Sequence, residues 1–142
     1  MGIDITIFIA DDDQDDRYFL IQALSAFNDA LKYVEVADGT LLVRELTNIQ
    51  DPGKILVIVD MNMPRLNGLD TVKALKSDDK LSGIPILMMS TSSDEWLVRQ
   101  ARNAGISKFS IKPSTFEDFI DLAEQICVEF DIPITKNKQN YH

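Results

Sequence analysis

The stretch from Ile55 to Gly68 constrains the fold more than any other part of the chain. Five consecutive apolar residues, Ile55 to Val59, lead directly into one carboxylate, Asp60, and turn-forming Asn, Pro and Gly residues follow. A short β-branched run bounded by turn formers is typical of a strand that is buried on both faces. Such strands belong to parallel sheets covered by helices on both sides.

Asp60 would stand at the carboxyl end of this strand. Ligand sites of open parallel sheets lie beyond the carboxyl ends of their strands, so this position suits a functional carboxylate. Asp is also a common turn or helix-capping residue. The stretch alone leaves both interpretations open.

Strand and helix patterns alternate five times along the chain. Apolar runs predict strands over residues 3–10, 33–37, 55–60, 84–89 and 109–111. Apolar residues at helical spacing predict helices around residues 20–27, 41–46, 69–75, 96–104 and 116–130. The alternation predicts an α/β fold, a doubly wound parallel sheet with helices on both faces.

Helix boundaries can also be predicted. Ser92 with Glu95, and Ser114 with Glu117, have capping-box spacing and predict the starts of the fourth and fifth helices. Gly105 is expected to end the fourth helix.

Length and composition limit the classes of function. The 142 residues predict one domain over residues 1–130 and a polar, frayed tail over 131–142. The net charge of −9 argues against nucleic-acid and membrane binding, and favours a cation site or a basic partner. The only cysteine, Cys127, excludes an internal disulfide, and the only histidine, His142, argues against histidine-based catalysis. We expect a cytoplasmic protein, because no signal peptide or membrane-spanning run is present in the sequence.

An acidic run follows the first predicted strand. Five of the six residues from Asp11 to Asp16 are aspartates, which repel one another unless a cation or solvent relieves them. The dipole of the following helix accounts for Asp15 and Asp16 as acids of its first turn, and Asp13 is a further candidate for this role. It accounts less well for Asp11 and Asp12, at the strand end. Because Mg²⁺ prefers carboxylate oxygens with water and phosphate, these two residues are candidate metal ligands.

Polar residues follow four of the five predicted strands. They are Asp11 with Asp12, Asp60, Ser90 and Lys112. Any one of them could be a cap or a solvated loop residue. Since carboxyl ends of parallel strands share one edge of the sheet, their recurrence predicts that acids, a hydroxyl and an ammonium meet at one site.

The chain resembles the response-regulator receiver domain, the CheY-like phospho-acceptor module of two-component signalling. The matching motifs are Ala10–Asp13, Val59–Pro64 with Gly68, Met89–Thr91, and Phe109 with Lys112–Pro113. They span Ile3 to about Phe130 and form a specific set in this order and spacing. The resemblance implies a flavodoxin-like (βα)5 fold with strand order 2-1-3-4-5.

The resemblance also implies roles for individual residues. Asp60 would be phosphorylated, and Mg²⁺ would be held by Asp60, Asp12 and the backbone carbonyl of Asn62, with Asp11 binding mainly through water. Ser90 would bond a phosphoryl oxygen. Lys112 would pair with the phosphate, and with Asp60 before phosphorylation.

The family further implies a cis Lys112–Pro113 peptide bond and a switch. Ser90 would move toward the phosphoryl group, and Phe109 would turn into the vacated space, although Phe109 could instead be plain core. The face formed by the fourth helix, fifth strand and fifth helix would then change. Trp96 could belong to this face or simply pack.

We therefore expect a stand-alone receiver that takes a phosphoryl group from a sensor histidine kinase or histidine phosphotransferase. It would catalyse only its own Mg²⁺-dependent phosphorylation and dephosphorylation, and would signal to an output protein as a monomer or homodimer. The alternatives are a phosphorelay intermediate and a non-phosphorylated pseudo-receiver.

Three further features bear on this expectation. A dehalogenase-type phosphatase would need an acid where Asn62 stands. Ser90 replaces the threonine common in the family, which could make the switch less sharp. Thr91 replaces a smaller residue, and could narrow access to Asp60.

Overall fold

Five parallel strands form one sheet in the order β2-β1-β3-β4-β5, which confirms the predicted fold and strand order. The structure is a computed structural model that describes residues 4–50 and 53–136. The strands are β1 (Ile5–Ala10), β2 (Lys32–Val36), β3 (Lys54–Asp60), β4 (Ile86–Ser90) and β5 (Lys108–Ile111). Ile3, expected in the first strand, lies outside the described residues.

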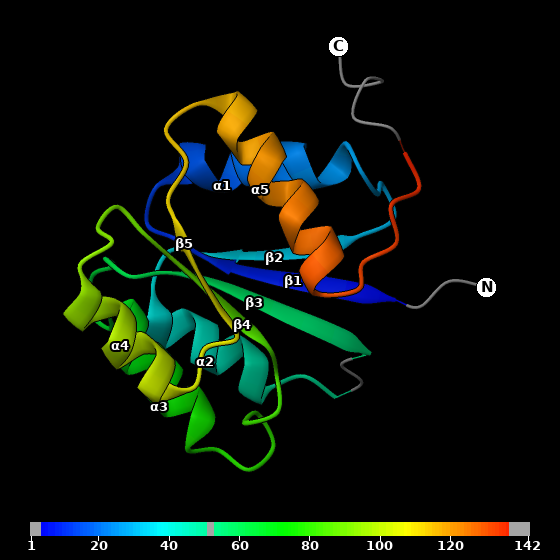
Figure 1. The fold of residues 1–142 in the computed structure, drawn as a ribbon. Coiled ribbons are helices and arrows are strands. Elements are labelled where there is room, and N and C mark those ends of the chain that lie inside the picture. The colour runs from blue at the N-terminus through cyan, green and yellow to red at the C-terminus, as the bar shows by residue number, and fades with distance from the viewer. Residues whose placement is uncertain (1–3, 51–52, 137–142) are drawn as a thin grey trace.

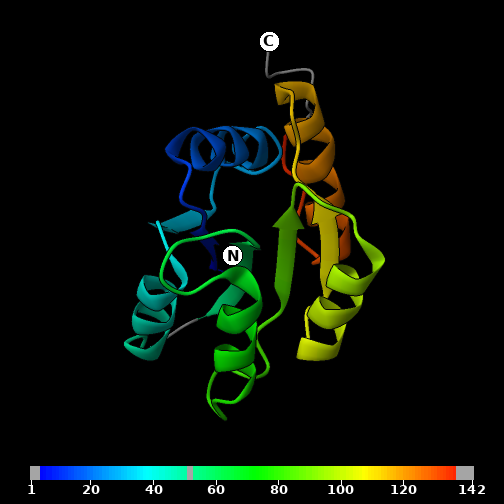
Figure 2. The same cartoon turned by 90° about the vertical axis from the view of Figure 1, so that its left-hand side faces the viewer.

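Helices cover both faces of the sheet (Figures 1 and 2). They are α1 (Gln14–Ser25), α2 (Gly39–Thr47), α3 (Gly68–Lys76), α4 (Glu95–Ala104) and α5 (Phe116–Glu129). α1 and α5 lie side by side on one face, and α2, α3 and α4 cover the other (Figure 1). Among the described residues, we find no helix whose length and apolar character would let it cross a bilayer.

The apolar run of β3 is buried on both faces, as its sequence predicts. Leu56 and Ile58 join the core under α1 and α5, whereas Val57 and Val59 join the core over α2, α3 and α4. Burying an aliphatic side chain of this size contributes about 1.5–3 kcal/mol. A charge inside this run would be costly, so β3 carries charge only at its two ends, on Lys54 and Asp60.

The turn after β3 depends on Gly68. A Cβ atom at this position would lie 2.5 Å from the Asp60 carbonyl oxygen and 2.7 Å from the Met61 Cα. Without a side chain, the first residue of α3 can approach the strand end, and its N–H donates to the Met61 carbonyl at 2.9 Å. This contact fixes the backbone that carries Asp60.

The two predicted capping boxes are wrong in position. Asp94, not Ser92, caps α4 by accepting from the N–H groups of Trp96 and Leu97, while the Ser92 hydroxyl accepts from the Asp94 N–H. Thr115 caps α5 where the sequence pattern pointed to Ser114. Neighbouring Ser, Thr and Asp residues all make good caps, so spacing alone could not choose among them. The predicted end of α4 at Gly105 is confirmed by its left-handed backbone, with φ 112°.

The segment Asp131–Lys136 is packed, not frayed as the sequence predicted. Ile132 is 3% exposed and lies in the core beside Phe27. Two backbone N–H groups of the segment donate to the Phe27 carbonyl, at 2.8 and 2.9 Å, and the Asn28 amide donates to the Pro133 carbonyl at 2.9 Å. Two isoleucines in a short, otherwise polar stretch are too few to show a helical or strand period, so this docking could not be predicted from the sequence. Residues 137–142 lie outside the described part.

We predict that Ile132→Ala lowers the free energy of unfolding by about 2–4 kcal/mol, because it leaves a cavity beside α1. Urea denaturation would measure the change. Ile134→Ala is the matched control: Ile134 is 48% exposed, and its truncation should cost under about 1 kcal/mol. Equal effects of the two substitutions would contradict the docking of this segment.

Candidate functional site

The carboxyl ends of four strands bring the predicted polar residues to one edge of the sheet. Asp11 follows β1, Asp60 ends β3, Ser90 ends β4 and Lys112 follows β5. Asp11, Asp60 and Ser90 are buried, and Lys112 is half-buried. The Lys112 backbone N–H donates to the Ser90 carbonyl at 2.8 Å, which fixes these two strand ends relative to each other.

Three carboxylates at this edge form a candidate metal centre. Oxygens of Asp11, Asp12 and Asp60 all lie within 4.8 Å of one another. The Oδ1 atom of Asp11 accepts from the Asp13 N–H at 2.9 Å, and its buried Oδ2 lies 3.0 Å from the Lys112 Nζ. Asp12 is exposed and leaves one side of the cluster open to solvent. Three clustered carboxylates with one side open to solvent fit a hard cation such as Mg²⁺.

Asn62 lies on the exposed loop after β3. Its backbone N–H bonds to the Asp60 carboxylate. The role of its carbonyl as a metal ligand stays a prediction.

Lys112 contacts three carboxylates with one ammonium group. Its Nζ lies 3.4 Å from Asp60, which is the pairing that the family resemblance implies, and 3.0 Å from Asp11. Its shortest contact, 2.8 Å, is with Asp16. An ammonium group offers three N–H donors and no acceptor, so these three carboxylates can take up all of its donors.

The contact between Asp16 and Lys112 was not predicted. The sequence pattern assigned Asp16 only to the acidic first turn of a helix, and α1 does begin there, capped by Asp13. A signal was nevertheless present, since Asp16 lies four residues before the buried Leu20 and thus on the same helix face. Asp15, one residue earlier, is exposed.

Arg17 is a second residue that sequence reasoning missed. Its Nε donates to Glu35 Oε1 at 3.1 Å, and its Nη1 donates to the Asp11 carbonyl. Arg17 therefore joins the first turn of α1 to the ends of β1 and β2. These contacts help to hold the first turn of α1, which carries Asp16.

Burial and mutual repulsion change the acidity of the site. Burial, and then the charge of Asp11, raise the pKa of Asp60 to about 6, although Lys112 and the Asn62 N–H oppose the shift. Burial also raises the pKa of Asp11. Burial alone would lower the pKa of Lys112, but the carboxylates of Asp16, Asp11 and Asp60 outweigh it and raise that pKa.

The residues expected to act as the switch are Ser90, at the end of β4, and Phe109, in β5. The Ser90 hydroxyl accepts from the Ser92 N–H at 3.1 Å, so its own proton remains available. Phe109 is half-buried against the core of α2, α3 and α4. Trp96 is 64% exposed on α4, so it is a surface residue and does not pack in the core.

The expected cis peptide bond at Lys112–Pro113 is wrong. All peptide bonds between described residues are trans, the form that X–Pro bonds favour by about 0.5–1 kcal/mol.

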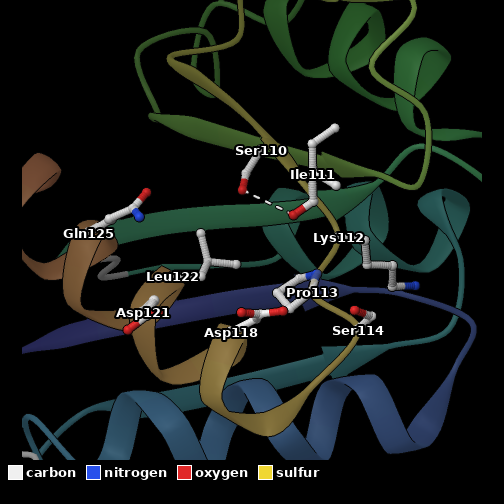
Figure 3. Close-up of a pocket in the computed structure, with 9 residues that line it drawn as sticks. All are labelled: Ser110, Ile111, Lys112, Pro113, Ser114, Asp118, Asp121, Leu122 and Gln125. Atoms are coloured by element: carbon white, nitrogen blue, oxygen red, sulfur yellow. Dashed lines mark hydrogen bonds between the residues drawn. The ribbon is translucent and has the colours of Figure 1, made fainter.

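A pocket of about 350 Å³ lies beside the site, between β5, the following loop and α5 (Figure 3). Figure 3 shows that the Lys112 side chain extends away from Asp118 and Asp121 of α5. The acids of α5 thus line the pocket, while the ammonium group serves the carboxylates at the strand ends.

The model of the response regulator receiver domain family matches residues 7–124, most of the chain. The chain belongs to the response regulator receiver family. Receivers act in two-component signalling together with histidine kinases.

Among curated proteins, this receiver is similar to chemotaxis protein CheY1 of Helicobacter pylori. The two are 42% identical over 60 residues, which cover 42% of this chain and 48% of that protein. The match thus spans about half the length of this relative.

Solved structures share the fold of this receiver. The phosphorylated cyanobacterial phytochrome response regulator RcpA superposes with a TM-score of 0.77 at 23% identity, over 86% of this chain and 90% of that one. The Mn²⁺-bound form of response regulator Rcp1 gives 0.78 at 18% identity, over 93% and 98%.

We predict that Asp60→Asn stabilises the metal-free receiver at pH 7.5. The folded state keeps the Asp60 proton up to a pKa of about 6, against 3.8 for the unfolded chain, so stability falls as pH rises through this window. The substitution should raise the free energy of unfolding in EDTA by about 2 kcal/mol at pH 7.5, and by less than about 1 kcal/mol at pH 4.

Urea denaturation at both pH values measures this difference. Asp79→Asn removes an exposed acid and should change stability little at either pH. If Asp60→Asn were less stable than wild type at pH 7.5, the ionised Asp60 would not destabilise the folded state, and the prediction would be wrong.

Proposed function

We propose that this receiver accepts a phosphoryl group on Asp60 from the phosphohistidine of a sensor histidine kinase or a histidine phosphotransferase. The observation that carries the proposal is the buried Asp60 carboxylate, clustered with Asp11 and Asp12 and contacted by Lys112. A nucleophile beside an ammonium group and a candidate cation site has what phosphoryl transfer requires.

The chemistry follows from the side chains. An Asp60 oxygen attacks phosphorus, the bond from phosphorus to the histidine nitrogen breaks, and an acyl phosphate forms on Asp60. Lys112 pairs with the oxygens of the transferred phosphoryl group, and the Ser90 hydroxyl donates a hydrogen bond to one of them. Because Asp60 itself accepts the phosphoryl group, we expect the protein to catalyse only its own phosphorylation and dephosphorylation, and not the turnover of other substrates.

Asp60, Asp12 and the Asn62 carbonyl would hold Mg²⁺, with Asp11 acting through water. The ion would offset the negative charge that gathers during transfer. The clustering of the three carboxylates and the open side at Asp12 support this assignment. The Mn²⁺-bound form of Rcp1 is a divalent-metal complex of a protein that shares the fold.

Phosphorylation would be read out at the face of α4, β5 and α5. Ser90 would move toward the phosphoryl group, and Phe109 would follow from its half-buried position. The exposed Trp96 on α4 and Ile111, 50% exposed on β5, give this face apolar contacts for an output protein.

We expect acetyl phosphate to add one phosphoryl group to the wild-type chain only when Mg²⁺ is present. Three carboxylates would otherwise repel the anionic donor. Intact-protein mass, recorded with Mg²⁺ and with EDTA, measures the label.

Asp60→Asn should stay unlabelled, whereas Asp79→Asn should label like wild type. A yield that is unchanged by EDTA would defeat the Mg²⁺ requirement. Absence of label on folded wild type, even from a phosphorylated histidine phosphotransferase, would favour a pseudo-receiver.

A further inference from the structure

Asp16 takes the shortest of the three contacts of Lys112. The distance is 2.8 Å, against 3.4 Å to Asp60, the residue that the proposed function pairs with Lys112. The side chains of Asp16 and Lys112 are 24% and 11% exposed. Solvent therefore screens this pair less than a surface ion pair.

Asp16 competes for Lys112 from a fixed position. The first turn of α1 is capped by Asp13, whose side chain accepts from the Asp15 and Asp16 N–H groups at 2.9 and 3.2 Å. Arg17 clamps the same turn to Glu35 and to the Asp11 carbonyl. These contacts hold the backbone that carries Asp16 beside Lys112.

A phosphoryl group on Asp60 would add a further anionic partner for the Lys112 ammonium. It adds roughly −2 of charge and strong acceptor oxygens. Asp16 draws the ammonium toward α1 and adds a fourth carboxylate to Asp11, Asp12 and Asp60, against one ammonium. Both effects disfavour the phosphorylated state.

We propose that Asp16 is a positioning residue that restrains Lys112 and thereby limits how tightly the site holds a phosphoryl group. This inference rests on the proposed function of Asp60. Neutralising Asp16 leaves Lys112 free to pair with the phosphoryl oxygens.

The test uses beryllium trifluoride with Mg²⁺, a stable mimic of a phosphoryl group on a carboxylate, and the full chain. Titration calorimetry measures its dissociation constant for wild type, Asp16→Asn, Asp16→Glu and Asp15→Asn. We expect Asp16→Asn to bind about fivefold more tightly, the upper range for release of one ion pair.

Asp15→Asn is the matched control, because Asp15 is an exposed acid of the same helical turn. It removes the same charge without touching Lys112, and should stay within about twofold of wild type. Asp16→Glu keeps the carboxylate and should restore binding close to the wild-type value.

A double-mutant cycle tests whether Asp16 acts through Lys112. Urea unfolding of the metal-free protein should give non-additive effects for Asp16→Asn with Lys112→Gln, and additive effects for Asp15→Asn with Lys112→Gln.

Three results would overturn the inference. They are additive effects in the Asp16 cycle, equal affinities of Asp16→Asn and Asp15→Asn, and weaker binding by Asp16→Asn. Failure of the folded wild type to bind beryllium trifluoride with Mg²⁺ would instead refute the proposed function, and the inference with it. If the wild type binds, the proposed function stands, and the variants then test the role of Asp16 alone.

Discussion

One ammonium group, that of Lys112, offsets the negative charge gathered at the carboxyl edge of the sheet. It contacts Asp11 and Asp60, which are buried, and Asp16, which is half-buried. Removing the Lys112 ammonium from this cluster would leave the buried carboxylates uncompensated, which is strongly destabilising. The same contacts join β1, α1 and β3 to the loop after β5, so the electrostatics of the site and the assembly of the sheet edge depend on each other.

The charge lies at this edge because the interior of the sheet cannot accept it. Residues Ile55 to Val59 of β3 are buried under helices on both faces, so polar side chains can stand only at the ends of the strand. Local contacts of the backbone then determine where these polar side chains lie. Gly68 lets α3 begin against the backbone of Asp60, and Asp13 with Arg17 fixes the first turn of α1.

Different interactions stabilise the carboxyl edge of the sheet and the region near the C-terminus. At the carboxyl edge, polar contacts link the strand ends, as in the hydrogen bond from the Lys112 N–H to the Ser90 carbonyl. Near the C-terminus, Ile132 enters the core and backbone groups of its segment bond to Phe27, which fastens the chain after α5 to the end of α1. Phosphorylation chemistry would thus act on the polar edge, while apolar packing holds α1 and α5 together.

The sequence by itself determined the α/β class, the alternation of elements and the meeting of Asp11, Asp12, Asp60 and Lys112, because hydrophobic periodicity and strand ends are local properties. The strand order came from the family resemblance, and the structure confirmed it. The tertiary structure decided what depends on helix rotation and loop path. It turned Asp16 toward Lys112, chose Asp94 and Thr115 as caps over Ser92 and Ser114, and docked Ile132. Such contacts join residues far apart in the chain, or choose between chemically equivalent neighbours, and only packing in three dimensions settles them.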